Sequence, residues 1–188
     1  MDNLRRKDMA AGKIDQGKTG AAVTATSDRE FVITRVFDAP RELVWKAHSE
    51  VERLKHWWGP KGFTMDVGTL DFRPGGVFHY HLRSPEGFVM WGKFMYREIV
   101  APERIVCIVS FSDENGGVTR HPMSQTWPLE TLNTLTLSEH GGKTTLTIRS
   151  VPHGATAEER KTFEAGFDSM QQGFKGTLDQ LAEYLAKA

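Results

Sequence analysis

The stretch TAEERKTFEAGFDSMQQGFKGTLDQLAEYL, residues 156–185, predicts one long terminal helix that needs a second layer to pack against. Thr156 and Glu159 have the spacing of a capping box, in which both side chains satisfy backbone N–H groups of the first turn. Apolar residues then recur at intervals of three and four, which places them on one helix face. These residues are Phe163, Phe167, Met170, Phe174, Leu178, Leu181 and Leu185.

Three glycines interrupt the predicted helix at Gly166, Gly173 and Gly176. A glycine in a helix interior costs about 1 kcal/mol relative to alanine, so three of them need an explanation. Either another backbone passes close to the helix, or the helix leaves room for a ligand. We favour the first explanation.

The chain before this helix contains seven segments typical of β-strands, separated by Pro and Gly turn signals. The first segment is rich in β-branched residues, and its side chains alternate between two faces with a period of two. The segments are residues 31–37, 63–72, 77–83, 88–100, 104–111, 129–139 and 143–151. Their close spacing favours antiparallel pairing, because parallel strands need crossover connections of a dozen residues or more.

Two short helices are expected between the first strand and the second. Asp38 is the expected N-cap of the first helix, and a capping box of Ser49 and Glu52 is expected to begin the second. The spacing of apolar residues then predicts that Trp58 lies on the buried face of the second helix. Trp57 is expected a third of a turn away, where helix and loop meet the sheet, near one mouth of the cavity that the fold is expected to leave.

These elements predict an α+β fold, in which a curved antiparallel sheet of six or seven strands wraps around the long C-terminal helix. The two short helices are expected to close one end. A helix is about 10–12 Å across, so a single helix cannot cover a wide curved sheet, and we expect a cavity between the two layers. This domain is predicted to span residues 28–188. Residues 1–27 are poor in large apolar residues and are predicted to be a flexible tail.

Composition restricts the possible functions. The chain of 188 residues carries 24 basic and 24 acidic side chains, which argues against a nucleic-acid partner. No segment approaches the roughly 20 apolar residues of a membrane span, so no membrane insertion is expected. The single cysteine, Cys107, excludes an intrachain disulfide and is expected to be a small buried hydrophobe. Without a convincing signal sequence, the protein is expected to be cytoplasmic. The sequence implies no oligomeric state.

Motifs for catalysis and metal binding are weak. His79 and His81 would lie on one face of a strand, a spacing that zinc sites use, but no third ligand is apparent and a solvent face is expected. The patterns of serine hydrolases, P-loops and dinucleotide-binding folds are absent. Asp168, on the terminal helix, could act as an acid or base at a cavity wall, but a surface role is favoured. We therefore predict no metal, no cofactor and no catalytic residue.

Four segments carry a resemblance to a known superfamily. They are WWGPKGF at 57–63, FRPGGVFHYHLRSPEG at 72–87, WGKFMYREIVAPERIV at 91–106 and GFDSMQQGFKGTLDQLAEYL at 166–185. Together with the order of elements, they resemble the SRPBCC superfamily, which includes START-like and birch-pollen-allergen-like domains. Within it the chain is most similar to bacterial homologues of the activator of heat-shock-protein ATPase, the Aha-like branch. The resemblance implies a helix-grip fold around a deep pocket.

The predicted function is binding of a small hydrophobic or amphipathic molecule in this pocket. Strand alternation puts Phe78, Tyr80 and Phe94 on the concave face of the sheet. The full set of predicted ligand-binding residues is Trp58, Phe63, Phe78, Tyr80, Phe94, Trp127, Phe167, Met170 and Phe174. The alternative for the two adjacent tryptophans is that they plug the open end of the sheet. The long segment 112–128, without a clear period, is expected to act as a lid.

Two other functions stay open. The superfamily also contains enzymes of the cyclase and hydrolase kind, and such an enzyme would use the same pocket. The name of the resembled branch implies a chaperone-associated role in the stress response. Co-chaperone activation in that branch normally uses a further N-terminal domain, whereas residues 1–27 offer only a short tail, so a chaperone partner is not favoured.

Overall fold

The computed structural model describes residues 29–188, and the predicted tail, residues 1–27, lies outside the described residues. The described part forms eight strands and four helices. In chain order they are β1 (Phe31–Phe37), α1 (Arg41–Ser49), α2 (Val51–Leu54), β2 (Thr64–Leu70), β3 (Val77–Arg83), β4 (Val89–Val100), β5 (Arg104–Ser112), β6 (Val118–Thr119), β7 (Glu130–His140), β8 (Lys143–His153), α3 (Ala157–Ala165) and α4 (Phe167–Leu185).

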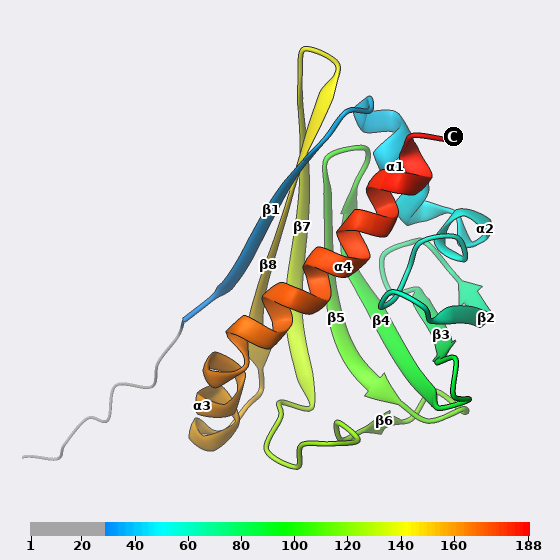
Figure 1. The fold of residues 1–188 in the computed structure, drawn as a ribbon. Coiled ribbons are helices and arrows are strands. Elements are labelled where there is room, and N and C mark those ends of the chain that lie inside the picture. Colours follow the sequence, from blue (N-terminus) through cyan, green and yellow to red (C-terminus); the bar gives the residue numbers. More distant parts are fainter. Residues whose placement is uncertain (1–28) are drawn as a thin grey trace, which may run out of the picture.

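The strands form one antiparallel sheet in the order β1-β8-β7-β5-β4-β3-β2, with β6 paired to β5. The sheet is strongly curled, α4 crosses its concave face, and α1 and α2 lie at one end (Figure 1). The predicted α+β helix-grip fold is confirmed. The sequence did not predict β6, because two residues are too few to show a period.

The first strand joins the sheet beside the last one. β1 pairs with β8 along its whole length, from Phe31 opposite Ser150 to Phe37 opposite Thr144. The Phe31 ring stacks on Phe174 of α4, with 5.6 Å between the ring centroids. This pairing therefore joins the edge of the sheet to the helix that covers it.

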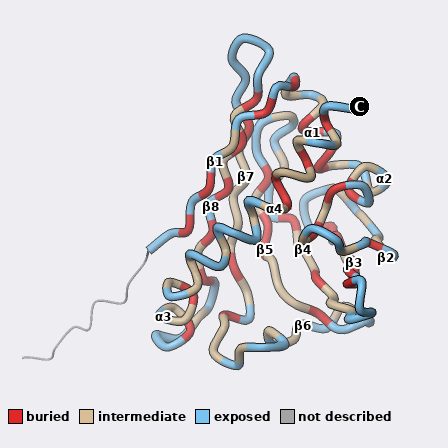
Figure 2. Tube along the Cα trace, viewed as in Figure 1, coloured by how far each residue is buried: buried red, intermediate tan, exposed pale blue. Residues whose placement is uncertain are grey.

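The core lies between the concave face of the sheet and the inner sides of the helices. Buried segments gather on the strands that face α4 and on the inner sides of α1 and α4 (Figure 2). Leu146 of β8, Phe163 of α3 and Leu181 of α4 are fully buried. The apolar stripe of the terminal helices therefore packs on the sheet as predicted from its spacing.

The prediction of one continuous terminal helix is wrong at Gly166, where α3 ends and α4 begins. A Cβ atom at Gly166 would lie 2.7 Å from a ring carbon of Trp127, so a side chain, and not a backbone, approaches closely there. At Gly173 and Gly176 a Cβ atom would meet nothing within 4 Å. The favoured explanation, close approach of another backbone, therefore holds at none of the three glycines.

The two caps predicted for the short helices are also wrong. The N-cap of α1 is Pro40 and that of α2 is Glu50, and neither helix start has a side-chain cap. Ser49 is still the last residue of α1, so its hydroxyl is not placed at the start of α2. Asp38 is exposed and pairs with Lys143 instead.

The capping box of α3 is confirmed and has a further partner. The Thr156 hydroxyl accepts from the Glu159 N–H, and the Glu159 carboxylate accepts from the Thr156 N–H. Arg120, in segment 112–128, donates to the same carboxylate. The Arg120 guanidinium, and after it the Thr156 N–H, hold the pKa of Glu159 below its usual value. Glu159 thus fixes both the start of α3 and the long segment.

This contact predicts a pH dependence of stability. Because the pKa of Glu159 is lower in the folded chain than in the unfolded one, its contribution is present above the unfolded value near 4.5. It is lost as the pH falls through the folded pKa. Glu159→Gln keeps a capping side chain but no charge, so wild type should lose more stability than the variant below about pH 4.5. Thermal unfolding across this pH range measures the difference, and parallel curves for the two proteins would contradict the assignment.

Candidate functional site

A cavity of about 160 Å³ lies between the concave face of the sheet, α4 and the chain that follows α2. Side chains from α1, β3, β4, β5, β7, β8 and α4 contribute to its walls. Most of them are aromatic or aliphatic, and none is Asp, Glu, Lys or Arg. The cavity expected from the width of the sheet is therefore present, although it is small.

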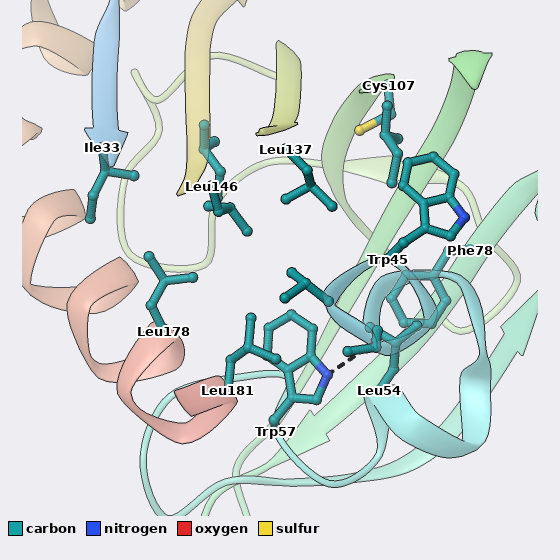
Figure 3. Close-up of a cluster of buried hydrophobic side chains, with 14 of the residues drawn as sticks. Ile33, Trp45, Leu54, Trp57, Phe78, Cys107, Leu137, Leu146, Leu178 and Leu181 are labelled. Carbon is teal, nitrogen blue, oxygen red and sulfur yellow. Dashed lines mark hydrogen bonds between the residues drawn. The ribbon is translucent and has the colours of Figure 1, made fainter. Parts of the chain in front are cut away.

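The two adjacent tryptophans are placed in the reverse of the predicted arrangement. Trp57 is 2% exposed, and its indole Nε1 donates to the Ala47 carbonyl at 3.1 Å. Figure 3 shows its side chain between Leu181 and Leu54. Trp58 is only partly buried. The prediction fails because α2 ends at Leu54 and the chain continues as a tighter turn, which shifts the direction of the side chains that follow.

Polar side chains of α4 hold this tryptophan segment in place. The Thr177 hydroxyl donates to the Gly59 carbonyl at 3.0 Å, and the Gln180 amide donates to the same carbonyl at 2.6 Å. Gln180 also donates to the Trp57 carbonyl at 3.2 Å. Backbone acceptors that would otherwise be left without partners are satisfied in this way. Both tryptophans therefore keep a fixed position on the cavity wall.

Tyr80 owes its position to a glycine on the neighbouring strand. Tyr80 of β3 lies opposite Gly92 of β4, and a Cβ atom at Gly92 would lie 2.5 Å from the tyrosine hydroxyl. The hydroxyl therefore occupies the space that any other residue at position 92 would fill. Burial raises the pKa of Tyr80 to about 12 and outweighs the nearby Trp58 side chain, which lowers it. Tyr80 is thus uncharged at neutral pH.

A row of polar side chains crosses the apolar floor of the sheet. Ser150, Asn133, Cys107 and Tyr96 lie opposite one another on β8, β7, β5 and β4. The Ser150 hydroxyl donates to the Asn133 side-chain oxygen at 2.7 Å. Burial raises the pKa of the Cys107 thiol to about 12, so it stays protonated and is a poor nucleophile at neutral pH. Cys107 is buried, as predicted.

His48 adds a neutral imidazole to the cavity wall. Its side chain is buried, and Nδ1 lies 2.8 Å from the Val44 carbonyl oxygen. Burial lowers the pKa of His48 to about 4, with a smaller opposing effect of the bond to Val44. No side chain in the cavity lining therefore carries a charge at neutral pH.

Sequence reasoning missed both His48 and Asn133. Asn133 offered a signal, because asparagine is depleted in strands and this one occupies the inward column between Thr131 and Leu135. His48 lies four residues after Val44 on a helix, and this spacing alone does not distinguish a buried histidine from an exposed one.

The structure brings together five of the nine predicted ligand-binding residues. Those lining the cavity are Trp58, Phe78, Tyr80, Phe94 and Phe174. Phe63, Phe167 and Met170 pack against the core without lining it. Phe167 is the first residue of α4 and lies beside Phe31 and Phe163, whereas the tryptophan segment is bound by Gln180 near the other end of this helix.

Trp127 belongs to a separate hollow on the far side of Tyr80 and Val109, which line both spaces. We call this space the outer hollow; Trp127, Pro128 and Leu129 form one of its walls. The Trp127 ring packs on Phe163 of α3 at 5.5 Å. The end of segment 112–128 therefore lies over a space that adjoins the cavity.

The histidine pair of β3 lies under a tryptophan. His81 is 8% exposed and contacts the Trp91 ring at 4.7 Å, so the predicted solvent face is wrong for this residue. His79 stacks on the same ring at 4.7 Å. Within residues 29–188, no three His, Cys, Asp or Glu side chains are grouped so that they could hold a metal ion. Asp168 is exposed and does not line the cavity.

None of the described helices combines the length and apolar character needed to cross a membrane. The described residues also place no charged acid–base pair in the cavity. The arrangement is suited to holding a neutral molecule by packing and by hydrogen bonds from uncharged groups.

Solved structures resemble this chain over most of its length. A protein from Arthrobacter aurescens is 25% identical, with a TM-score of 0.69, and the match covers 85% of this chain and 87% of that one. A protein from Nitrosomonas europaea is 25% identical, with a TM-score of 0.65 and coverage of 84% and 94%. A protein from Silicibacter pomeroyi described as AHSA1 is 18% identical, with a TM-score of 0.65 and coverage of 84% and 98%, and shows the fold alone.

No curated protein matches the chain. Residues 38–186, however, match the family described as Activator of Hsp90 ATPase homolog 1-like protein. The match begins at the end of β1 and includes every wall of the cavity. The resemblance drawn from the sequence is confirmed, and the chain belongs to the Activator of Hsp90 ATPase homolog 1-like family of the SRPBCC superfamily.

Proposed function

We propose that this protein binds a small, uncharged and mostly apolar molecule in the cavity between the sheet and α4. The observation that carries the proposal is the cavity itself, with its apolar walls and a few neutral polar groups. This is the usual make-up of a small-molecule site. An empty cavity of about 160 Å³ forfeits roughly 4 kcal/mol of stability at about 24 cal/mol per Å³. A bound molecule that fills the cavity would recover part of that loss.

Volume and charge limit what fits. A protein cavity of about 150 Å³ lined by apolar side chains can hold benzene, so a cavity of about 160 Å³ suits a molecule of one ring. A charged group would lose its hydration without gaining an ionic partner, because no lining residue carries a charge at neutral pH. The proposed ligand is therefore a neutral single-ring compound or one of similar size.

Segment 112–128 is proposed as the lid of this site. It ends over the outer hollow, which shares Tyr80 and Val109 with the cavity as lining residues. Two polar contacts anchor the segment to α3, in addition to the packing of Trp127 on Phe163: Arg120 pairs with Glu159, and the Thr126 hydroxyl lies 2.9 Å from that of Thr162. If the segment controls exit, Glu159→Gln should release a bound ligand faster than wild type, and equal release rates would contradict a lid.

Toluene is a suitable probe of the proposed site, because it is neutral and has a single ring. We expect it to raise the melting temperature in a concentration-dependent and saturable manner, since a ligand that binds only the folded state stabilises it. A free toluene concentration of 100 times Kd should raise the free energy of unfolding by about 2.7 kcal/mol. Benzoate, which has a ring of the same size but a negative charge, is the matched control and should give no shift.

Differential scanning calorimetry with both compounds measures this difference. No stabilisation by toluene up to its solubility limit would contradict the proposed function. An equal shift with benzoate would contradict the requirement for a neutral ligand.

A further inference from the structure

The His48 side chain has one nitrogen that is used within the protein and one that is not. Nδ1 lies 2.8 Å from the Val44 carbonyl oxygen, four residues earlier on α1. The ring also contacts Trp57 edge-on, with 4.8 Å between the ring centroids. Nε2 makes no hydrogen bond to any other part of the chain that the structure describes, and His48 lines the cavity.

The partner of Nδ1 determines where the proton sits. A backbone carbonyl only accepts hydrogen bonds, so Nδ1 must carry the hydrogen. In a neutral imidazole the other nitrogen then has a lone pair and no hydrogen, and acts only as an acceptor. Burial favours this neutral form of His48. The cavity therefore presents an imidazole acceptor that lacks a donor.

The other uncharged polar groups in the cavity differ from His48 in this respect. The Tyr80 and Tyr96 hydroxyls can each donate or accept a hydrogen bond, so they can pair with either a donor or an acceptor on a ligand. The Thr177 hydroxyl already lies 3.0 Å from the Gly59 carbonyl, to which it donates. The Asn133 oxygen already accepts from Ser150. The Trp58 indole N–H is buried without a partner among the described residues and requires an acceptor, whereas His48 requires a donor.

We propose that the cavity selects neutral ring compounds that carry an O–H or N–H group, which donates to Nε2 of His48. Phenols and nitrogen heterocycles with an N–H group belong to this class. The inference rests on the proposed function and adds the chemical class of the ligand to it. An acceptor on the cavity wall that has no partner in the described chain gains a hydrogen bond when the ligand donates to it, which favours ligands of this class.

Two probes of nearly equal shape test the class. 4-Methylphenol carries a donor, whereas 4-fluorotoluene has fluorine in place of the hydroxyl and carries none. The matched variant is His48→Asn, whose side-chain amide can still donate to Val44 from about the position of Nδ1 but has no atom at the position of Nε2. Titration calorimetry gives the ratio of the two affinities in each protein.

We expect the ratio of 4-methylphenol to 4-fluorotoluene affinity to fall roughly 3- to 10-fold in His48→Asn, the usual worth of one hydrogen bond. An unchanged ratio, with both probes still binding, would overturn the assignment to His48 and leave the proposed function standing. Failure of both probes to bind wild type would overturn the two together.

A second measurement on wild type covers the case in which His48→Asn does not fold. In protein labelled with ¹⁵N, the Nε2 resonance of His48 should move on saturation with 4-methylphenol and not with 4-fluorotoluene. A resonance that moves equally with both probes, or with neither although they bind, would overturn the proposal.

Discussion

Trp57→Ala is expected to lower the free energy of unfolding by roughly 3–5 kcal/mol, the usual cost of deleting a large buried aromatic side chain. Trp57 is 2% exposed and lies in the main core cluster, and its indole N–H is bonded to the Ala47 carbonyl. Trp58→Ala should cost less than about half as much, because Trp58 is only partly buried and its side chain therefore loses fewer contacts.

Urea unfolding followed by circular dichroism compares the two variants without relying on the deleted fluorophores. Trp57→Phe is the matched control: it keeps an aromatic ring in the core but removes the N–H donor and part of the ring volume, so a loss smaller than that of Trp57→Ala is expected. A larger loss for Trp58→Ala than for Trp57→Ala would contradict the arrangement of the tryptophan pair.

Leu135→Trp is expected to abolish toluene binding while the fold stays intact. Leu135 of β7 lines the cavity, and a tryptophan there would place a second ring where the ligand is proposed to lie. The steric cost of a larger core residue, about 1–3 kcal/mol, should be partly offset because the new ring fills open space. Stability should therefore change by less than about 2 kcal/mol.

Leu132→Trp is the matched control for this substitution. Leu132 lies on the same strand three residues earlier, so its side chain points to the opposite face of the sheet. Toluene should bind this variant as it binds wild type. If titration calorimetry shows that Leu135→Trp also binds toluene with unchanged affinity, the ligand does not occupy the cavity.

The elements that sequence reasoning predicted well are those with a long, regular period. The range 77–83 coincides with β3, and Phe78 and Tyr80 are buried on one face as the alternation predicts. The capping box of Thr156 and Glu159 also has the predicted bonds, because a cap depends on residues close in sequence. Local sequence patterns were therefore sufficient to predict the fold class and most of the strand positions.

The wrong predictions concern features that depend on contacts between residues far apart in the sequence. The direction of Trp57 and Trp58 depends on how the chain turns after Leu54, and Gln180 of α4 holds that turn through its bond to the Trp57 carbonyl. The space for glycine alone at position 166 depends on the Trp127 ring, which lies far away in the sequence. No periodicity within one segment reports on such contacts.

The existence of the cavity could be predicted from the sequence, but its lining residues could be predicted only in part. A sheet wider than its covering helix predicts a space, and side-chain alternation identified Phe78, Tyr80 and Phe94 as parts of its wall. The hydrogen-bonding groups could not be identified in the same way. His48 reaches the cavity from α1, and its tautomer depends on the Val44 carbonyl, which a residue pattern does not reveal.

The most direct test of ligand binding in the cavity is a ¹H–¹⁵N spectrum of the indole N–H groups recorded during a toluene titration. The chain has five tryptophans, of which Trp57 and Trp58 line the cavity. Trp45 packs edge-on against Phe72, outside the cavity lining, and serves as the internal control. The proposal predicts that the Trp57 and Trp58 signals shift and saturate together while the Trp45 signal stays in place. Signals of Trp57 and Trp58 that do not move at saturating toluene would contradict it.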